Sequence, residues 1–194
     1  MSLGLRERKK QATRASLAAA ALRLAAERGP DHVTVEQIAE AAGVSPRTFF
    51  NHFCTKEEAF VADDLDRARD LMERMRTEPL EQPVWPLLTR NLGAFLDHGH
   101  DRAQARAQYA VRMTPAVVAQ QQAQYATLEA DLVEELARRL PNGDRLRARL
   151  LAGAAVAAMR AAVETWVVDD QDRTLPQLFD LAVDHLTPAF AKES

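Results

Sequence analysis

Hydrophobic residues recur every three or four positions along most of the chain, and no segment has a convincing strand pattern. One stripe includes Leu17, Ala21 and Leu24, and a second runs from Phe60 to Met75. The pattern predicts an all-α protein of about nine helices. They lie at about 11–28, twice within 34–52, and at about 55–77, 84–97, 102–112, 115–139, 144–169 and 175–190.

The two short helices flank a tight turn. Thr34, with Gln37 three residues later, has the pattern of a capping box. Gly43 stands where the first short helix needs a residue that accepts a left-handed conformation. Ser45 is a second N-cap, and a proline follows it at the first helical position. A helix, a glycine turn and a second, polar-faced helix are the pattern of a DNA-binding helix-turn-helix.

The helix predicted over 55–77 is long enough to belong to two domains at once. Its roughly 20 residues span ~30 Å at 1.5 Å per residue, and Thr55 with Glu58 forms another capping box at its start. We expect residues 1–55 to hold a mobile basic arm over 1–10 and a three-helix DNA-binding domain, with the helix-turn-helix at about 34–53. Residues 56–194 form a second helical domain.

The distribution of charge along the chain is more informative about binding partners than the net charge of −3. Residues 1–60 hold nine Lys/Arg and seven Asp/Glu, whereas the rest holds 16 and 21. A basic end on an acidic body suits a protein that offers that end to a polyanion. The single cysteine, Cys54, fits a reducing cytoplasm. We find no apolar run of the roughly 18 residues that a membrane span needs and no signal-peptide core, so we expect a cytoplasmic protein without a membrane partner.

The chain resembles the TetR family of transcriptional regulators. The segments that carry the resemblance are TRASLAAAALRLAAERG (13–29), VTVEQIAEAAGVSPRTFFNHF (33–53) and TKEEAF (55–60), about the first third of the chain, and the paired phenylalanines resemble an actinobacterial-looking subset. The resemblance implies a homodimer that binds a palindromic operator, usually as a repressor. It also implies that the second domain binds a small molecule, which releases the DNA, and forms the dimer.

The candidates for DNA contact lie mainly on the second short helix. Arginine suits guanine edges, asparagine suits adenine, and threonine suits a methyl group or a phosphate. By resemblance, a lysine at the start of the fourth helix contacts phosphate, where the helix N-terminus also favours an anion. A solvated polar face and a solubilising arm are the plain alternatives. The full set is Thr34, Ser45, Arg47, Thr48, Phe50, Asn51, His52, Lys56, Arg14 and Lys10.

The candidates for effector contact are large residues of the second domain, with arginines as polar anchors. They are Trp85, Leu88, Leu92, Phe95, Tyr109, Arg112, Met113, Tyr125, Leu128, Met159, Arg160 and Trp166. Their character favours a small hydrophobic effector, although plain core helices have the same composition. Arg160 and Glu164 interrupt an apolar run, and the alternative for this i, i+4 pair is an intrahelical ion pair.

Small residues dominate the helix predicted over 144–169 and suit close packing between two copies of the chain. Burial inside one copy is the alternative, and the resemblance favours a dimer. The candidates are Gly153, Ala154, Ala157, Ala158 and Ala161, with Leu178, Leu181 and Leu186 of the last helix.

Other chemistry has little support in the sequence. His98-Gly99-His100-Asp101 lacks the i, i+4 histidine spacing of a helical metal site and is interpreted as a solvated turn. We identify no catalytic constellation and expect neither a cofactor nor a metal. A sequestering protein with an idle DNA-binding end and an activator of the same family remain as alternatives to a repressor.

Overall fold

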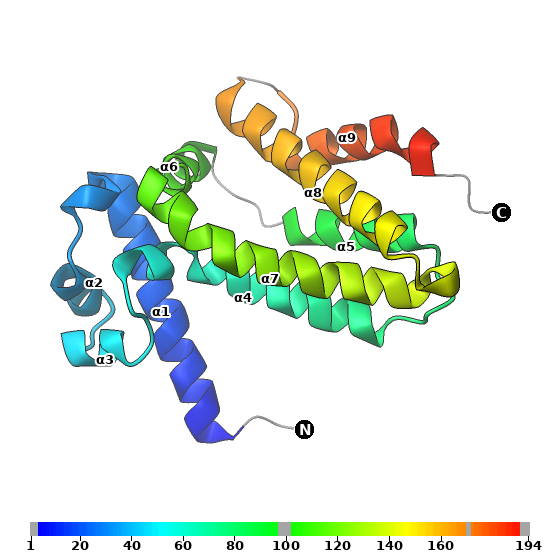
Figure 1. Cartoon of the computed structure of the whole chain (residues 1–194). Coiled ribbons are helices and arrows are strands. Elements are labelled where there is room, and N and C mark those ends of the chain that lie inside the picture. Colours follow the sequence, from blue (N-terminus) through cyan, green and yellow to red (C-terminus); the bar gives the residue numbers. More distant parts are fainter. Residues whose placement is uncertain (1–3, 97–101, 170–171, 191–194) are drawn as a thin grey trace. The chain divides into compact units, whose positions relative to one another are not determined.

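A computed structural model describes residues 4–96, 102–169 and 172–190, with the side chains of Leu5, Phe95 and residues 123–125 left out. Nine α-helices and two short 3₁₀ helices account for the regular structure in these ranges, which contain no strand (Figure 1). The all-α prediction is confirmed. The helices are α1 (Leu5–Arg28), α2 (Val35–Ala41), α3 (Pro46–Phe50), α4 (Lys56–Thr77), α5 (Val84–Leu96), α6 (Arg102–Arg112), α7 (Pro115–Arg139), α8 (Arg145–Val168) and α9 (Leu175–Phe190).

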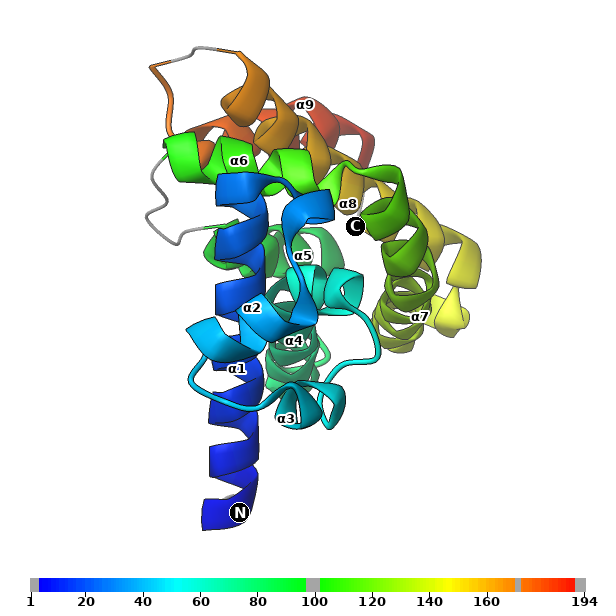
Figure 2. The same ribbon diagram turned by 90° about the vertical axis from the view of Figure 1, so that its left-hand side faces the viewer.

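The first helix begins earlier than the sequence pattern predicts. Residues from Leu5 onward are helical, so most of the segment predicted to be a mobile arm belongs to α1. Its first turns project past α2 and α3 (Figure 2). Arginine, lysine and glutamine have good helix propensity but produce no apolar stripe, which explains why the pattern missed these turns. Gly29 ends the helix with φ +84°, and its N–H donates to the Ala25 carbonyl.

The helices group into two compact units. The first contains residues 1–66 and 103–124, and the second contains 67–102 and 125–194, so α4 and α7 contribute to both. The core of the first unit includes Leu17, Ile38 and Phe49, each wholly buried.

The core of the second unit is built mainly from α5, α8 and α9. Leu88 of α5, Leu151 of α8 and Phe179 of α9 are buried there. Close packing of α9 on α5 is visible at Gly93, where a Cβ atom would lie 3.6 Å from the Phe179 ring.

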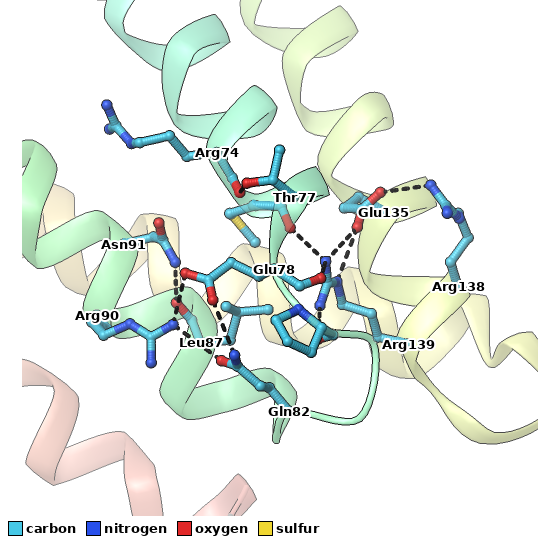
Figure 3. A network of polar contacts seen from close by, with 12 residues as sticks. Arg74, Thr77, Glu78, Gln82, Leu87, Arg90, Asn91, Glu135, Arg138 and Arg139 are labelled. Atoms are coloured by element: carbon cyan, nitrogen blue, oxygen red, sulfur yellow. Dashed lines mark hydrogen bonds and ion pairs between the residues drawn. The ribbon is translucent and has the colours of Figure 1, made fainter.

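A buried arginine fixes the end of α4 within the second unit (Figure 3). The Arg139 guanidinium, fully buried, donates to the backbone carbonyls of Met75, Glu78 and Pro79 and pairs with buried Glu135 at 2.9 Å. The last carbonyls of a helix have no intrahelical partner. From α7, Arg139 donates to one of them, the Met75 carbonyl, which also accepts from the Glu78 N–H, and to two carbonyls of the turn that follows the helix. Glu135 balances its charge.

The helix α8 is long and apolar enough to cross a membrane by length and composition alone. The sequence analysis found no uninterrupted apolar run of this length, because charged residues such as Arg160 and Glu164 interrupt the helix, which is still apolar on average. The core helix of a soluble protein passes the same test. Eight residues of α8, from Ala148 to Val167, are buried inside the chain.

Candidate nucleic-acid interface

Local hydrogen bonds define both ends of the turn between α2 and α3. The Thr34 hydroxyl accepts from the Gln37 N–H, and the Gln37 carboxamide accepts from the Thr34 N–H at 3.1 Å, completing the predicted capping box. Gly43 has φ +70°, the left-handed conformation in which a Cβ atom is disfavoured. The Ser45 hydroxyl accepts from the Thr48 N–H at 3.1 Å. The caps and the left-handed glycine form the predicted turn between α2 and α3.

Aromatic packing orients α3. Phe49 and Phe53 are fully buried, with ring centroids 5.5 Å apart. Phe50 packs edge-on against Phe49 but is 58% exposed. With one side of α3 held by the core, the opposite side faces outward.

The outward side of α3 presents Ser45, Arg47 and Asn51, all exposed, with Thr48 half-buried beside them. No hydrogen bond or ion pair occupies the side chains of Arg47 and Asn51 within the described residues. Ser45 and Thr48 are partly engaged, because their hydroxyls lie 2.9 Å apart. Arg47 and Asn51 thus keep their full hydrogen-bonding capacity for an outside partner, and these two groups are the ones that read guanine and adenine edges.

Two predicted DNA-contacting cations are bound to the chain's own backbone. The Lys56 ammonium donates to the carbonyls of Pro30 and Val33 at 2.9 and 3.0 Å. Arg14 pairs with Asp66 at 3.1 Å and donates to the His52 carbonyl at 3.0 Å. Lys56 and Arg14 therefore hold the domain together.

Arg14 also connects α1 with the end of α3. Its guanidinium lies 4.4 Å from the centre of the Phe53 ring. Burial, with the positive charges of Arg14 and Lys10, lowers the pKa of His52 below its ordinary value of 6.5. Lys10 is exposed on α1. The positive charges beside the end of α3 are therefore those of Lys10 and Arg14, which lie close to His52. This basic region is a suitable surface for a phosphate.

The candidates for effector contact are distributed over both units. Tyr109, Arg112 and Met113 belong to the first unit, whereas Trp85, Leu88, Leu92, Leu128, Met159, Arg160 and Trp166 belong to the second. The side chains of Phe95 and Tyr125 lie outside the described part.

Several of these residues have partners in their own unit. Arg112 forms an ion pair with Asp64 of α4 at 2.6 Å. The Trp85 indole N–H donates to the Thr187 hydroxyl at 3.0 Å. A surface hollow in the second unit is lined by Arg76, Asp131, Glu134, Glu135 and Arg138, none of which was predicted to bind an effector.

The candidates for dimer contact fall into two sets. Ala158 and Leu178 are buried inside the chain, and Ala154 and Leu186 are half-buried. The exposed members are Gly153, Ala157, Ala161 and Leu181. The intrahelical ion pair that was the alternative for Arg160 and Glu164 is not formed: both side chains are exposed, without a hydrogen bond or ion pair among the described residues.

Other chemistry is limited in the described ranges, where no group of three or more His, Cys, Asp or Glu side chains is arranged to hold a metal. The stretch from His98 to Asp101 lies outside them. Cys54 is exposed, and its backbone N–H donates to the Glu58 carboxylate at 2.8 Å.

Comparison with known proteins gives matches over both parts of the chain. Residues 17–62 match the family described as bacterial regulatory proteins, tetR family, and residues 82–191 match the MftR C-terminal domain. The HTH-type transcriptional regulator TcmR of Streptomyces glaucescens is 29% identical over 95% of this chain and 87% of its own length.

Solved structures share the fold at lower identity. A putative TetR-family regulator from Syntrophomonas wolfei superposes with a TM-score of 0.67 at 17% identity, over 92% of this chain and 95% of its own. NalD of Pseudomonas aeruginosa, described as the secondary repressor of a multidrug efflux pump, superposes with a TM-score of 0.65 at 19% identity, over 96% and 100%.

Proposed function

Because the chain belongs to the TetR family of transcriptional regulators and carries its DNA-binding domain, we propose that it is a homodimeric repressor. It binds a palindromic operator and leaves it when a small hydrophobic effector binds. The observation that carries the proposal is the outward side of α3, where Arg47 and Asn51 are exposed without contacts to the described chain.

The DNA end supplies both parts of operator recognition. Side chains on α3 suit base edges in the major groove, and the basic surface of α1 suits phosphates. In a two-fold dimer of this class, the two recognition helices lie about one DNA turn apart, ~34–36 Å. A palindromic operator with half-sites at that spacing follows from the symmetry.

Dimer formation is supported by α8, whose outer face carries apolar residues without cover from the chain. Leu146 is 70% exposed and Leu150 is 57% exposed, with Gly153 and Ala157 following along the helix. A stripe of exposed apolar residues at helical spacing is typical of a protein interface. We infer that a second copy of the chain covers this stripe.

Effector control is supported by a solved structure of the same fold and by the large residues of the second unit. The multidrug-binding protein EbrR, solved with ethidium, has the same fold with a TM-score of 0.55 at 19% identity. An apolar effector also suits the large residues of the second unit. An effector that binds one conformation better than the other shifts operator affinity by its differential binding energy, typically ~1–3 kcal/mol. The α4 helix, like α7, contributes to both units and is a continuous element for such coupling.

Members of this family are typically non-enzymatic cytoplasmic regulators. We propose the same location for this chain, and no enzymatic activity.

The rival function is that of a sequestering protein whose DNA-binding end is idle. A salt titration of binding to the DNA upstream of its own coding sequence separates the two. With 6–10 phosphate contacts we expect affinity to fall roughly 10³–10⁵-fold between about 50 and 200 mM salt. Weak binding at every salt concentration would favour the rival.

A further inference from the structure

Four exposed side chains of α8, two apolar and two charged, form a row along one face of the helix. Val156, Arg160, Glu164 and Val168 follow one another at four-residue spacing, so they form one line along the helix surface. All four are exposed, Val156 by 39% and Val168 by 60%. Along the helix the row is apolar, basic, acidic and apolar.

The two charges in this row do not neutralise each other within the helix. Neither Arg160 nor Glu164 has a hydrogen bond or ion pair to any described residue. Their order contributes to this, since an i, i+4 pair is more favourable with the acid N-terminal to the base. Both groups therefore remain available to a partner, between the apolar side chains of Val156 and Val168.

The row is complementary to itself when it is turned around. If two copies of α8 pack antiparallel about a two-fold axis level with Ala162, Arg160 of each copy lies opposite Glu164 of the other. The same operation places Val156 opposite Val168. Exposed Ala157 and Ala161 lie beside the row and have no side chain beyond Cβ, so the two helices can approach closely. A two-fold interface requires this kind of self-complementarity.

We propose that Arg160 and Glu164 select the dimer partner by forming two reciprocal ion pairs between subunits. The occupant of the row is a second copy of this chain, and the inference rests on the proposed homodimer. A helix of another regulator that lacks this charge order would place like or unpaired charges opposite Arg160 and Glu164. Such mismatches disfavour the wrong partner more than the correct pairs strengthen the right one.

Charge reversal tests the pairing in the full-length protein. Arg160→Glu and Glu164→Arg each convert two attractive pairs into two repulsive ones, and we expect each variant to dimerise about a hundred-fold more weakly. The two variants mixed together should form a heterodimer, because one then carries two acids and the other two bases. The double variant R160E/E164R should recover the homodimer. Sedimentation velocity and native mass spectrometry measure these species.

Arg145→Glu is the matched control, since it reverses an exposed charge of α8 outside the row, and its dimer should be unchanged. Recovery of the homodimer by R160E/E164R shows that the reversed side chains do not prevent folding. A dimeric wild type whose single variants dimerise normally, or whose mixture forms no excess heterodimer, would overturn the pairing. A wild type that is monomeric at micromolar concentration would instead overturn the proposed homodimer itself.

Discussion

The turn of the helix-turn-helix, in the DNA-binding unit, and the turn after α4, in the second unit, are held by polar contacts over very different distances along the chain. In the DNA-binding unit, Thr34 and Ser45 cap helices through partners three residues away. In the second unit, Arg139 reaches the Met75 carbonyl, 64 residues earlier. The turn between α2 and α3 is thus specified by local caps, whereas the turn after α4 depends on a tertiary contact.

Within the DNA-binding unit, Arg14 and Arg47 differ in whether the chain holds their side chains. Arg14 is bound to Asp66 and to the His52 carbonyl, whereas Arg47 has no such contact among the described residues. A side chain held by the chain stabilises the fold, and one left exposed serves recognition.

The largest effect is expected at Arg139. Arg139→Ala leaves the Glu135 carboxylate buried without its main partner and removes the donors to three carbonyls. We expect the free energy of unfolding to fall by about 3–5 kcal/mol. Urea unfolding followed by circular dichroism measures it.

The neighbouring Arg138 provides the control, because its side chain is 59% exposed although it also pairs with Glu135. Arg138→Ala should cost no more than about 1 kcal/mol. Equal losses for the two variants would mean that the buried contacts of Arg139 do not fix the turn after α4.

A smaller loss is expected at the turn of the helix-turn-helix. Gly43→Ala places a Cβ atom at φ +70°, and no other atom lies within 4 Å of it, so the cost is backbone strain alone. We expect about 1–2 kcal/mol of destabilisation. Gly43→Asn should lose less, because asparagine tolerates the left-handed region better. If both variants unfolded at the wild-type urea concentration, the turn would not need a glycine.

The smallest effects are expected from the titration of His52. Its pKa is lowered in the folded chain, so the unfolded state binds a proton more readily. The contribution of His52 to the free energy of unfolding is therefore fully present above pH 6.5. It is lost as the pH falls through 6.5 towards the lowered pKa. Unfolding of His52→Gln should lack this part of the pH dependence.

DNA binding should respond to pH in the opposite direction. A nearby phosphate favours the charged imidazole, so the complex takes up a proton and affinity rises from about pH 8 to about pH 6. The same variant should lose that rise in an anisotropy titration. An unchanged pH profile would place His52 away from the phosphates.

Sequence patterns predict the helices and the DNA-binding motif closely, because caps, the turn glycine and apolar stripes are local. They do not predict the partners of Arg14 and Lys56, since the basic residues look alike until packing brings Asp66 or the Pro30 carbonyl beside them. The early start of α1 carries no apolar signal. Glu135 and Arg139 form an i, i+4 pair that resembles a surface pair in the sequence, and only the fold shows its burial.

The predicted effector set illustrates a second limit of sequence patterns. Large apolar residues at helical spacing line a core and a binding site equally well. Leu88 and Trp166 are buried in the second unit, while Met113 is 52% exposed in the first. The dimer candidates show the same ambiguity: small residues occur on both faces of α8, and burial in the folded chain separates Ala158 from Ala157.

The most direct test of the account compares operator and scrambled duplexes for wild type and Arg47→Ala by fluorescence anisotropy at one salt concentration. If Arg47 is kept free to read a base, the variant loses about ten- to a hundred-fold in the ratio of the two affinities. Its unfolding transition stays at the wild-type position, because no contact within the described chain is removed. An unchanged ratio of affinities would contradict the central claim that the outward side of α3 reads the operator.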